Sequence, residues 1–322
     1  MEELIKMENL CNVCENSKFY FTKKNKVTDI SNTNWEHQST VELAGIKDNE
    51  FYIGFCKNCL NAKLFPEFDT NLIYRDKIGY ATRKKTYEKY FPSKKYYDLD
   101  DFSLNKKKRL IKSEIKRIRD IALDFSVFLN NQFKNQQEIN ILDFGGADAY
   151  LSKMLTNLLK IQTNKKMIIT NFDPQFIDQS KEIDKISYDF VIISHVLEHV
   201  HNLDELFSKL KKMINSKTII FFEVPDERFS LFKKFFFSEK VYLHYHVNFF
   251  STYGIRKLFK SNGLNTQISY KLSSYRGNTL TVISGFASES IKDKKNDIFY
   301  EFFSLFKFSF HKLISKFNNF NV

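Results

Sequence analysis

The chain has little glycine and little proline, with 9 and 4 among its 322 residues. Because these two residues most often interrupt helices and strands, their scarcity predicts mostly regular structure with short loops. No run of about 18 apolar residues occurs, which argues against a membrane-spanning helix. The first ten residues lack the apolar core of a signal peptide. We therefore expect a cytoplasmic location.

Basic residues outnumber acidic ones by 50 to 38, which gives a net charge of +12. This excess allows anionic partners such as nucleic acid, sugar phosphates or a lipid surface. The basic residues crowd between Lys106 and Arg119, and we expect them, Arg117 included, to form the solvated face of a helix over residues 103–134. The opposite face carries an apolar stripe at helical spacing, made of Leu110, Ile111, Ile115, Ile118, Ala122, Phe125 and Leu129.

All four cysteines fall into two C-x2-C pairs, Cys11 with Cys14 and Cys56 with Cys59. In a reducing compartment this pattern predicts a tetrahedral four-cysteine zinc site, and two disulfides are the alternative. Four sulfur ligands leave no open position for a substrate, so we expect the zinc to be structural. The 41 residues between the pairs are expected to form a small β insert.

The stretch from Ile139 to Asp173 indicates a strand, a tight glycine turn, a helix and a second strand. Gly145 and Gly146 follow the first strand directly, and glycine lets a ligand approach the backbone just before a helix N-terminus. Asp143 ends the first strand, and Asp173 ends the second, where an acid suits a ribose diol. We expect a bound ligand at this turn, an ordinary α/β turn being the alternative.

A buried strand is predicted over Phe190–Ile193, ending at Ser194 and His195, and ligands bind at such strand ends in open α/β sheets. His195 and His199 are four residues apart and would share one helical face, with Glu198 between them. The order H-V-L-E-H differs from the metalloprotease motif H-E-x-x-H, and no third ligand is evident. We therefore do not expect a metal ion here.

Further elements follow in the second half of the chain. The patterns predict a helix with apolar residues from Leu203 to Met213, a buried strand over Thr218–Pro225, a helix capped by Ser251 and a closing hairpin with its turn at Tyr275–Asn278. From Phe299 to Phe317, phenylalanines recur at helical spacing among lysines. Such a basic amphipathic helix can pack on its own domain, join a second subunit, or lie on a membrane surface.

Taken in order, these motifs resemble those of class I S-adenosylmethionine (SAM) methyltransferases. ILDFGGADAYLSKML is similar to the family's first motif, and NFDP to its acidic second motif. YDFVIISHVLEHVHNLDELFSKLKKMI and TIIFFEVPD are similar to its fourth and fifth strands with the intervening helix. With the N-terminal C-x2-C pairs, the chain resembles zinc-module methyltransferases of bacterial sugar pathways, which methylate carbons of nucleotide-linked keto-deoxysugars or sugar hydroxyls.

The resemblance implies that SAM is held by the residues of the turn and of the two strand ends: Asp143, Gly145, Gly146, Asp173, Ser194 and His195. The family's (E/H)H-x4-(F/S) element is similar to HYHVNFFS, which makes His246 the catalytic base, with His199 and His244 as the other candidates. Tyr245 stands where carbon-methylating members commonly carry glutamate, so methylation of carbon or oxygen stays open. Alanines replace the second and third glycines of the usual turn.

The expected architecture is α/β, with a Rossmann-like, mostly parallel sheet and helices on both faces over residues 136–290. A zinc-binding module over 1–66 and a connector with a helical lead-in over 67–135 precede it, and the Phe-rich helix over 291–322 follows. The expected function is methyl transfer from SAM to a small acceptor, a sugar nucleotide or surface-glycan precursor.

Two other functions are compatible with the sequence. A nucleic-acid methyltransferase would suit the charge, but the chain lacks the N/D-P-P-Y/F motif and, with zinc bound, a cysteine for base attack. A non-catalytic scaffold on a degenerate methyltransferase fold would suit the altered glycine turn and the Phe-rich tail.

Overall fold

The computed structural model describes residues 10–21, 25–26, 50–59, 61–65, 104–146, 150–172, 187–226, 246–275 and 278–291. Asp173, His244, most of the connector and the Phe-rich tail lie outside these residues. Within the described part of the chain, no helix is long and apolar enough to cross a membrane.

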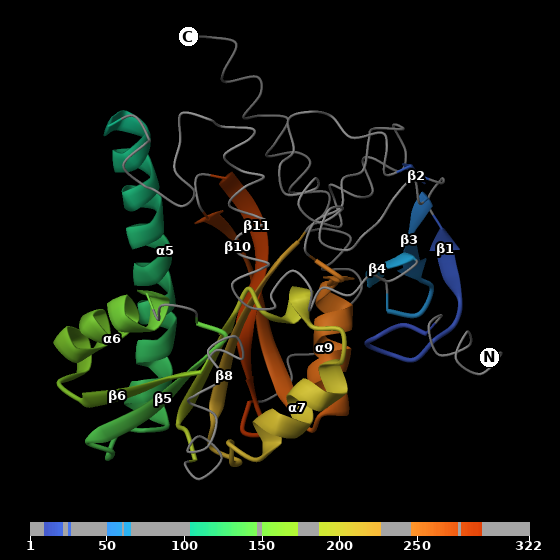
Figure 1. Cartoon of the computed structure of the whole chain (residues 1–322). Coiled ribbons are helices and arrows are strands. Elements are labelled where there is room, and N and C mark those ends of the chain that lie inside the picture. The colour runs from blue at the N-terminus through green and yellow to red at the C-terminus, as the bar shows by residue number, and fades with distance from the viewer. Residues whose placement is uncertain are drawn as a thin grey trace.

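A six-stranded sheet forms the centre of the protein (Figure 1). Its strands are β5 (Glu138–Phe144), β6 (Lys166–Phe172), β7 (Phe190–Ser194), β8 (Ile219–Pro225), β10 (Asn265–Tyr275) and β11 (Asn278–Ser288). They lie in the order β10-β11-β8-β7-β5-β6, and the four strands from β8 to β6 are parallel. β11 runs antiparallel to β8 and pairs with β10 as a hairpin. The predicted mostly parallel sheet and the closing hairpin are therefore confirmed.

Helices cover both faces of this sheet, as predicted (Figure 1). On one face lie α5 (Leu104–Asn131) and α6 (Tyr150–Thr163), and on the other α7 (Leu203–Lys211) and α9 (Thr252–Ser261). Successive strand residues point to opposite faces, so Ile192 of β7 joins the α5 core while Ile193 joins the α7 core. The Ser251 side chain caps α9 by accepting from the N–H of Gly254, as expected.

α5 confirms the predicted helix but corrects two expectations about its faces. Ile118, Ala122, Phe125 and Leu129 are buried against the sheet as predicted, whereas Ile115 is 40% exposed. Arg117, expected on the solvated face, is only 8% exposed because it reaches across the end of the sheet. The predicted basic face is therefore smaller than the count of lysines and arginines suggests.

A second, smaller sheet is formed mainly by the N-terminal part of the chain. Its strands are β1 (Phe19–Phe21), β2 (Asn25–Lys26), β3 (Glu50–Cys56), β4 (Ala62–Phe65) and β9 (Asn248–Phe249). β1, β3, β4 and β9 are neighbours in that order, and β2 pairs with β3, all antiparallel. Because β9 comes from the second half of the chain, this sheet joins the cysteine pairs to the segment that follows His246.

Candidate functional site

The strand order of the sheet reverses at β5: β6 pairs with one side of β5, and β7, the next strand in the chain, pairs with its other side. Such a switch point leaves a crevice at the carboxyl ends of the strands, where α/β sheets bind ligands. Gly145 follows β5 and Ser194 ends β7, so both predicted turns lie at this edge. The N–H of Gly145 donates to the carbonyl of Phe172 at 2.6 Å, which ties the turn to the end of β6.

Neither glycine of the turn could be replaced by a larger residue without a clash, because other atoms lie too close to the position of a Cβ. Gly145 has a φ of +76°, and a Cβ there would lie 2.5 Å from Cγ2 of Val196. A Cβ on Gly146 would lie 2.2 Å from the carboxyl carbon of Asp143. The turn therefore brings the Asp143 carboxylate, which is buried, directly beside the Gly146 backbone. Of the predicted cofactor residues, the structure gathers Asp143, both glycines, Ser194 and His195 at one edge.

We expect Gly145→Ala to destabilise the protein more than Gly263→Ala. Both glycines have positive φ, which costs an alanine about 1–2 kcal/mol, but the Cβ at Gly263 would meet nothing within 4 Å. Gly145→Ala adds the overpacking of Val196, about 1–3 kcal/mol. Denaturant unfolding of the two variants measures the difference. Equal losses would show that Val196 moves aside freely.

His195 does not share a helical face with His199, contrary to expectation. Its φ is +56°, and the short 3-10 helix η5 (Leu197–His199) begins only two residues later. This bend places the His195 ring between two buried carboxylates. Nδ1 lies 3.1 Å from Oε1 of Glu198, and Nε2 lies 3.9 Å from Oε2 of Glu223.

Arg117 and Glu223 form a buried ion pair beside His195. Nε and a terminal nitrogen of Arg117 donate to the two carboxylate oxygens of Glu223, and Ser194 Oγ donates to the same carboxylate at 3.0 Å. Burial alone would raise the pKa of Glu223, but the charge and hydrogen bonds of Arg117, with His195 and Ser194, outweigh it and hold the pKa below its usual range. The pair thus fixes α5 to the carboxyl ends of β7 and β8. Neither partner was singled out from the sequence as part of the site.

Glu198, His199 and His246 form a cluster, and Val196, two residues before Glu198, lies against Gly145 of the glycine turn. The ligand atoms of the cluster lie within 4.8 Å of one another, and the two histidine rings meet edge to face at 4.7 Å. Glu198 is 1% exposed; burial would raise its pKa, but the hydrogen bond from His195 and the nearby histidine charges lower it below its usual range. His246 is the third member of this group of potential metal ligands. The sequence did not reveal it as a partner of Glu198 and His199, because it follows His199 by 47 residues.

Hydrogen bonds hold the two parts of this cluster together. The N–H of Val247 donates to the carbonyl of Glu198 at 2.8 Å. The side-chain amide of Asn248 donates to the carbonyls of Leu197 and Val200, at 3.1 and 2.6 Å. The segment after His246 is therefore bound along η5, and the position of His246 follows from that contact.

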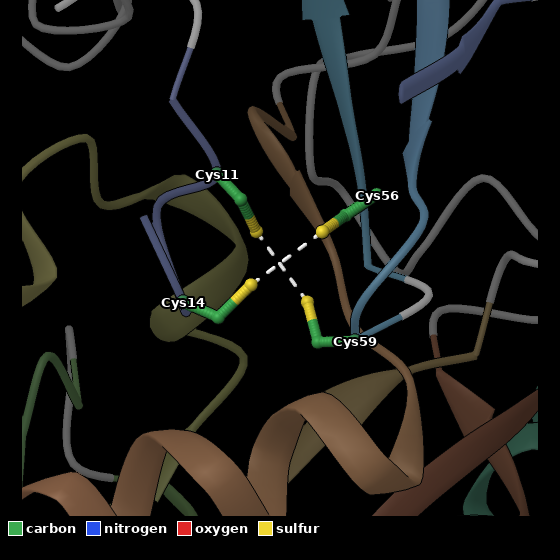
Figure 2. A group of neighbouring side chains, drawn as sticks. All are labelled: Cys11, Cys14, Cys56 and Cys59. Atoms are coloured by element: carbon green, nitrogen blue, oxygen red, sulfur yellow. Dashed lines mark hydrogen bonds between the residues drawn. The ribbon is translucent and has the colours of Figure 1, made fainter. Parts of the chain in front are cut away.

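The four cysteines converge on one point between the two C-x2-C turns (Figure 2). Sγ of Cys11 lies 3.4 Å from Sγ of Cys59, and Sγ of Cys14 lies 3.5 Å from Sγ of Cys56. All four are free thiols, so the disulfide alternative is wrong. Ligands of a tetrahedral zinc with bonds of about 2.3 Å lie about 3.8 Å apart, so this donor set fits zinc.

The pKa values of two thiols in the cysteine cluster are shifted in opposite directions. The hydrogen bond with Cys59 lowers the pKa of Cys11 to about 5, against the opposing effect of burial. Burial raises the pKa of Cys14. The N–H of Asn58 donates to Sγ of Cys56 at 3.4 Å, a bond that stabilises a thiolate.

The cysteine module contacts the segment of His246 directly. β4 pairs with β9 through Lys63 and Asn248, and the Ser251 hydroxyl donates to the carbonyl of Cys59 at 2.6 Å. Oδ1 of Asn61 accepts from the N–H of Ser251 at 2.8 Å. The second C-x2-C turn and the histidine cluster therefore lie at the two ends of one short hydrogen-bonded segment.

Comparison with solved structures finds many α/β proteins of low similarity. Magnesium protoporphyrin IX methyltransferase from Synechocystis PCC 6803, with bound SAH, is 12% identical over 58% of this chain and 88% of its own, with a TM-score of 0.34. A putative sarcosine dimethylglycine methyltransferase from Galdieria sulphuraria is 11% identical over 64% and 98%, with a TM-score of 0.35. No curated protein matches its sequence.

Residues 114–267, just under half of the chain, match a family model described as a methyltransferase domain. The matched region runs from α5 to the start of β10 and includes the glycine turn, His195, Glu198, His199 and His246. Over these residues the chain is similar to a methyltransferase domain.

Proposed function

We propose that the protein transfers a methyl group from SAM to a sugar nucleotide or surface-glycan precursor, with His246 as the general base. The observation that carries this proposal is the meeting of His246 and His199 over buried Glu198, next to the glycine turn. A histidine suits this role because its ordinary pKa lies near neutrality. His199 is the second candidate, and His244 lies outside the described residues.

In this proposal the carboxyl edge of the sheet holds SAM. Asp143 would accept from the cofactor's amine, the Gly145–Gly146 backbone would approach the amino-acid portion, and Ser194 and His195 would form the wall. Asp173, outside the described residues, would bind the ribose diol. SAM supplies a methyl group on a positively charged sulfur. The residues of the edge align it with the acceptor, and alignment alone can supply much of the rate acceleration.

At the histidine cluster the acceptor would lose its proton. The acceptor oxygen or carbon would take the methyl group, the electron pair of the broken carbon–sulfur bond would stay with the leaving sulfur, and His246 would accept the acceptor's proton. Glu198, ionised and buried below the rings, would stabilise the charge that His246 gains.

A sugar acceptor rests on the similarity of HYHVNFFS to the sugar methyltransferase element. Burial of Arg117 in an ion pair removes one cation from the surface that a nucleic acid would contact. The methyltransferase domain favours catalysis over the scaffold alternative. We also propose that the four cysteines bind a structural zinc ion, and that such reduced thiols belong in the cytoplasm.

We expect His246→Gln to lower turnover by about 10²- to 10⁴-fold, the usual contribution of a general base. The affinity for SAM should stay within about twofold of the wild-type value, because the substitution does not alter the glycine turn. Calorimetric titration of SAM into zinc-replete protein and steady-state turnover with sugar nucleotides measure the two effects. His201→Gln, a histidine outside the cluster, is the control. Unchanged turnover in His246→Gln would remove this residue from the mechanism, and unchanged SAM binding in Asp143→Ala would overturn the assigned cofactor site.

A further inference from the structure

We propose that Glu198, His199 and His246 bind a divalent transition-metal ion. Two imidazoles and one carboxylate are the ligand set of several catalytic zinc and iron sites. Their ligand atoms lie within 4.8 Å of one another. Ligands at tetrahedral angles, with bonds of about 2.1 Å, are about 3.4 Å apart, so the three side chains would move closer together when an ion binds.

Glu198 supplies an independent indication of a cation. Its side chain is buried, and Oε2 has no hydrogen-bond partner among the residues that the structure describes. A buried carboxylate oxygen without a partner is costly, because water no longer solvates its charge. The other oxygen, Oε1, lies 3.1 Å from Nδ1 of His195 and 4.0 Å from Nε2 of His199. A cation bound by the carboxylate and the two rings would satisfy the remaining oxygen.

The proposed ligands are held before any ion binds. Backbone and side-chain hydrogen bonds from Val247 and Asn248 fix β9 along η5, which carries Glu198 and His199. His195 is a positioning residue for Glu198, in the way that outer hydrogen bonds orient metal ligands. Pre-positioned ligands need little rearrangement on binding.

The location gives the ion a role in the reaction. Val196, next to this cluster, packs against Gly145 of the cofactor turn. Three protein ligands leave at least one position open, as in catalytic metal sites. An acceptor hydroxyl in that position would lose its proton more readily, because the cation stabilises the alkoxide. In the loaded site His246 is a ligand and cannot be the base, so the acceptor's proton would pass to solvent water. This role rests on the methyl transfer of the proposed function and is an alternative to its histidine base, whereas ion binding itself depends on neither.

Cobalt(II) is a suitable probe, because sulfur and nitrogen ligands give it different absorption spectra. Full-length protein with zinc already in the cysteine site is titrated with Co²⁺ and followed by visible absorption and calorimetry. We expect one Co²⁺ per chain, with the weak bands of nitrogen and oxygen ligands and no release of zinc. Absence of binding, or thiolate-to-cobalt bands accompanied by zinc release, would overturn the site.

Variants assign the bound ion to the cluster. Glu198→Gln and His246→Ala should weaken Co²⁺ binding by more than the roughly 10- to 100-fold that loss of an outer partner costs, while His201→Ala should not. Glu198→Gln keeps the size of the side chain, so it carries the test if His246→Ala fails to fold; unchanged affinity in the folded variant would overturn the proposal.

Turnover separates this inference from the proposed function. Methyl transfer that rises with Co²⁺ occupancy supports the role of the ion. Turnover that does not change with occupancy would overturn that role and leave the histidine base. Binding of Co²⁺ in a protein that methylates no sugar nucleotide would support the metal site and reject only the acceptor.

Discussion

Arg117→Met should lower the free energy of unfolding by about 3–5 kcal/mol, the usual cost of breaking a buried ion pair from one side. The variant leaves Glu223 ionised and buried at the end of β8, where Arg117 no longer offsets its charge. Methionine keeps the apolar stem that packs along α5, so the loss reports the charge. Because the pKa of Glu223 is held below its usual range, the wild-type pair should persist at neutral pH and be lost only as pH falls below that range.

The neighbouring residue supplies a matched control for this experiment. Lys116 pairs with Asp120 at 3.3 Å on the exposed side of the same helix. Lys116→Met removes the same charge and should cost less than about 1 kcal/mol, because water screens the pair. Urea unfolding at neutral pH compares the two. Similar losses would mean that Arg117 contributes only as a surface charge, against the buried geometry.

Cys56→Ser should abolish zinc binding and, with it, methyl transfer. Structural zinc sites contribute about 10–16 kcal/mol of binding free energy in small zinc-binding peptides, so three sulfurs cannot hold the module as four do. Without the module, β9 loses its pairing with β4 and Ser251 loses its bond to Cys59. His246 would then be misplaced, although its own side chain is unchanged. SAM affinity should survive, because Gly145 follows β5, which belongs to the other sheet.

Elemental analysis for zinc, calorimetry with SAM and turnover together test this prediction. Asn58→Ala is the control, since the side chain of Asn58 is exposed and only its backbone N–H contacts Cys56. A Cys56→Ser protein that keeps a full equivalent of zinc would contradict the four-sulfur site. One that loses zinc but keeps full turnover would contradict the link between the module and His246.

The architecture could be predicted from local patterns, because each central element carries its own periodicity. The apolar residues of β7 and of the helix that begins at Leu203 bury as expected, and Ser251 caps α9 as expected. The glycine turn was predicted for the same reason, since the strand before it and the helix after it define its place. The four cysteines were recognisable because their spacing alone restricts the chemistry.

The residues that the sequence did not reveal depend on contacts between distant segments. In the sequence, Arg117 is one of several basic residues in a run. Its ion pair could not be predicted, because Glu223 follows it by 106 residues. The four-residue spacing from His199 led to the prediction that His195 lies on a helical face. Residue spacing does not indicate the positive φ that His195 adopts. His199 and His246 become partners because the segment after His246 is hydrogen-bonded along η5, a contact that no local pattern predicts.

The pairing of β4 with β9 also constrains the order in which the chain can fold. Asn61, next to the cysteine turn, and its contact Ser251 are separated by 190 residues, so the small sheet closes only after the four parallel strands of the central sheet have been synthesised. Contacts this distant in sequence form slowly. While synthesis proceeds, β4 presents an unpaired edge that invites association with other chains. An early-bound zinc ion would hold that edge in its folded shape, so zinc supply during translation should decide how much of the protein reaches its native state.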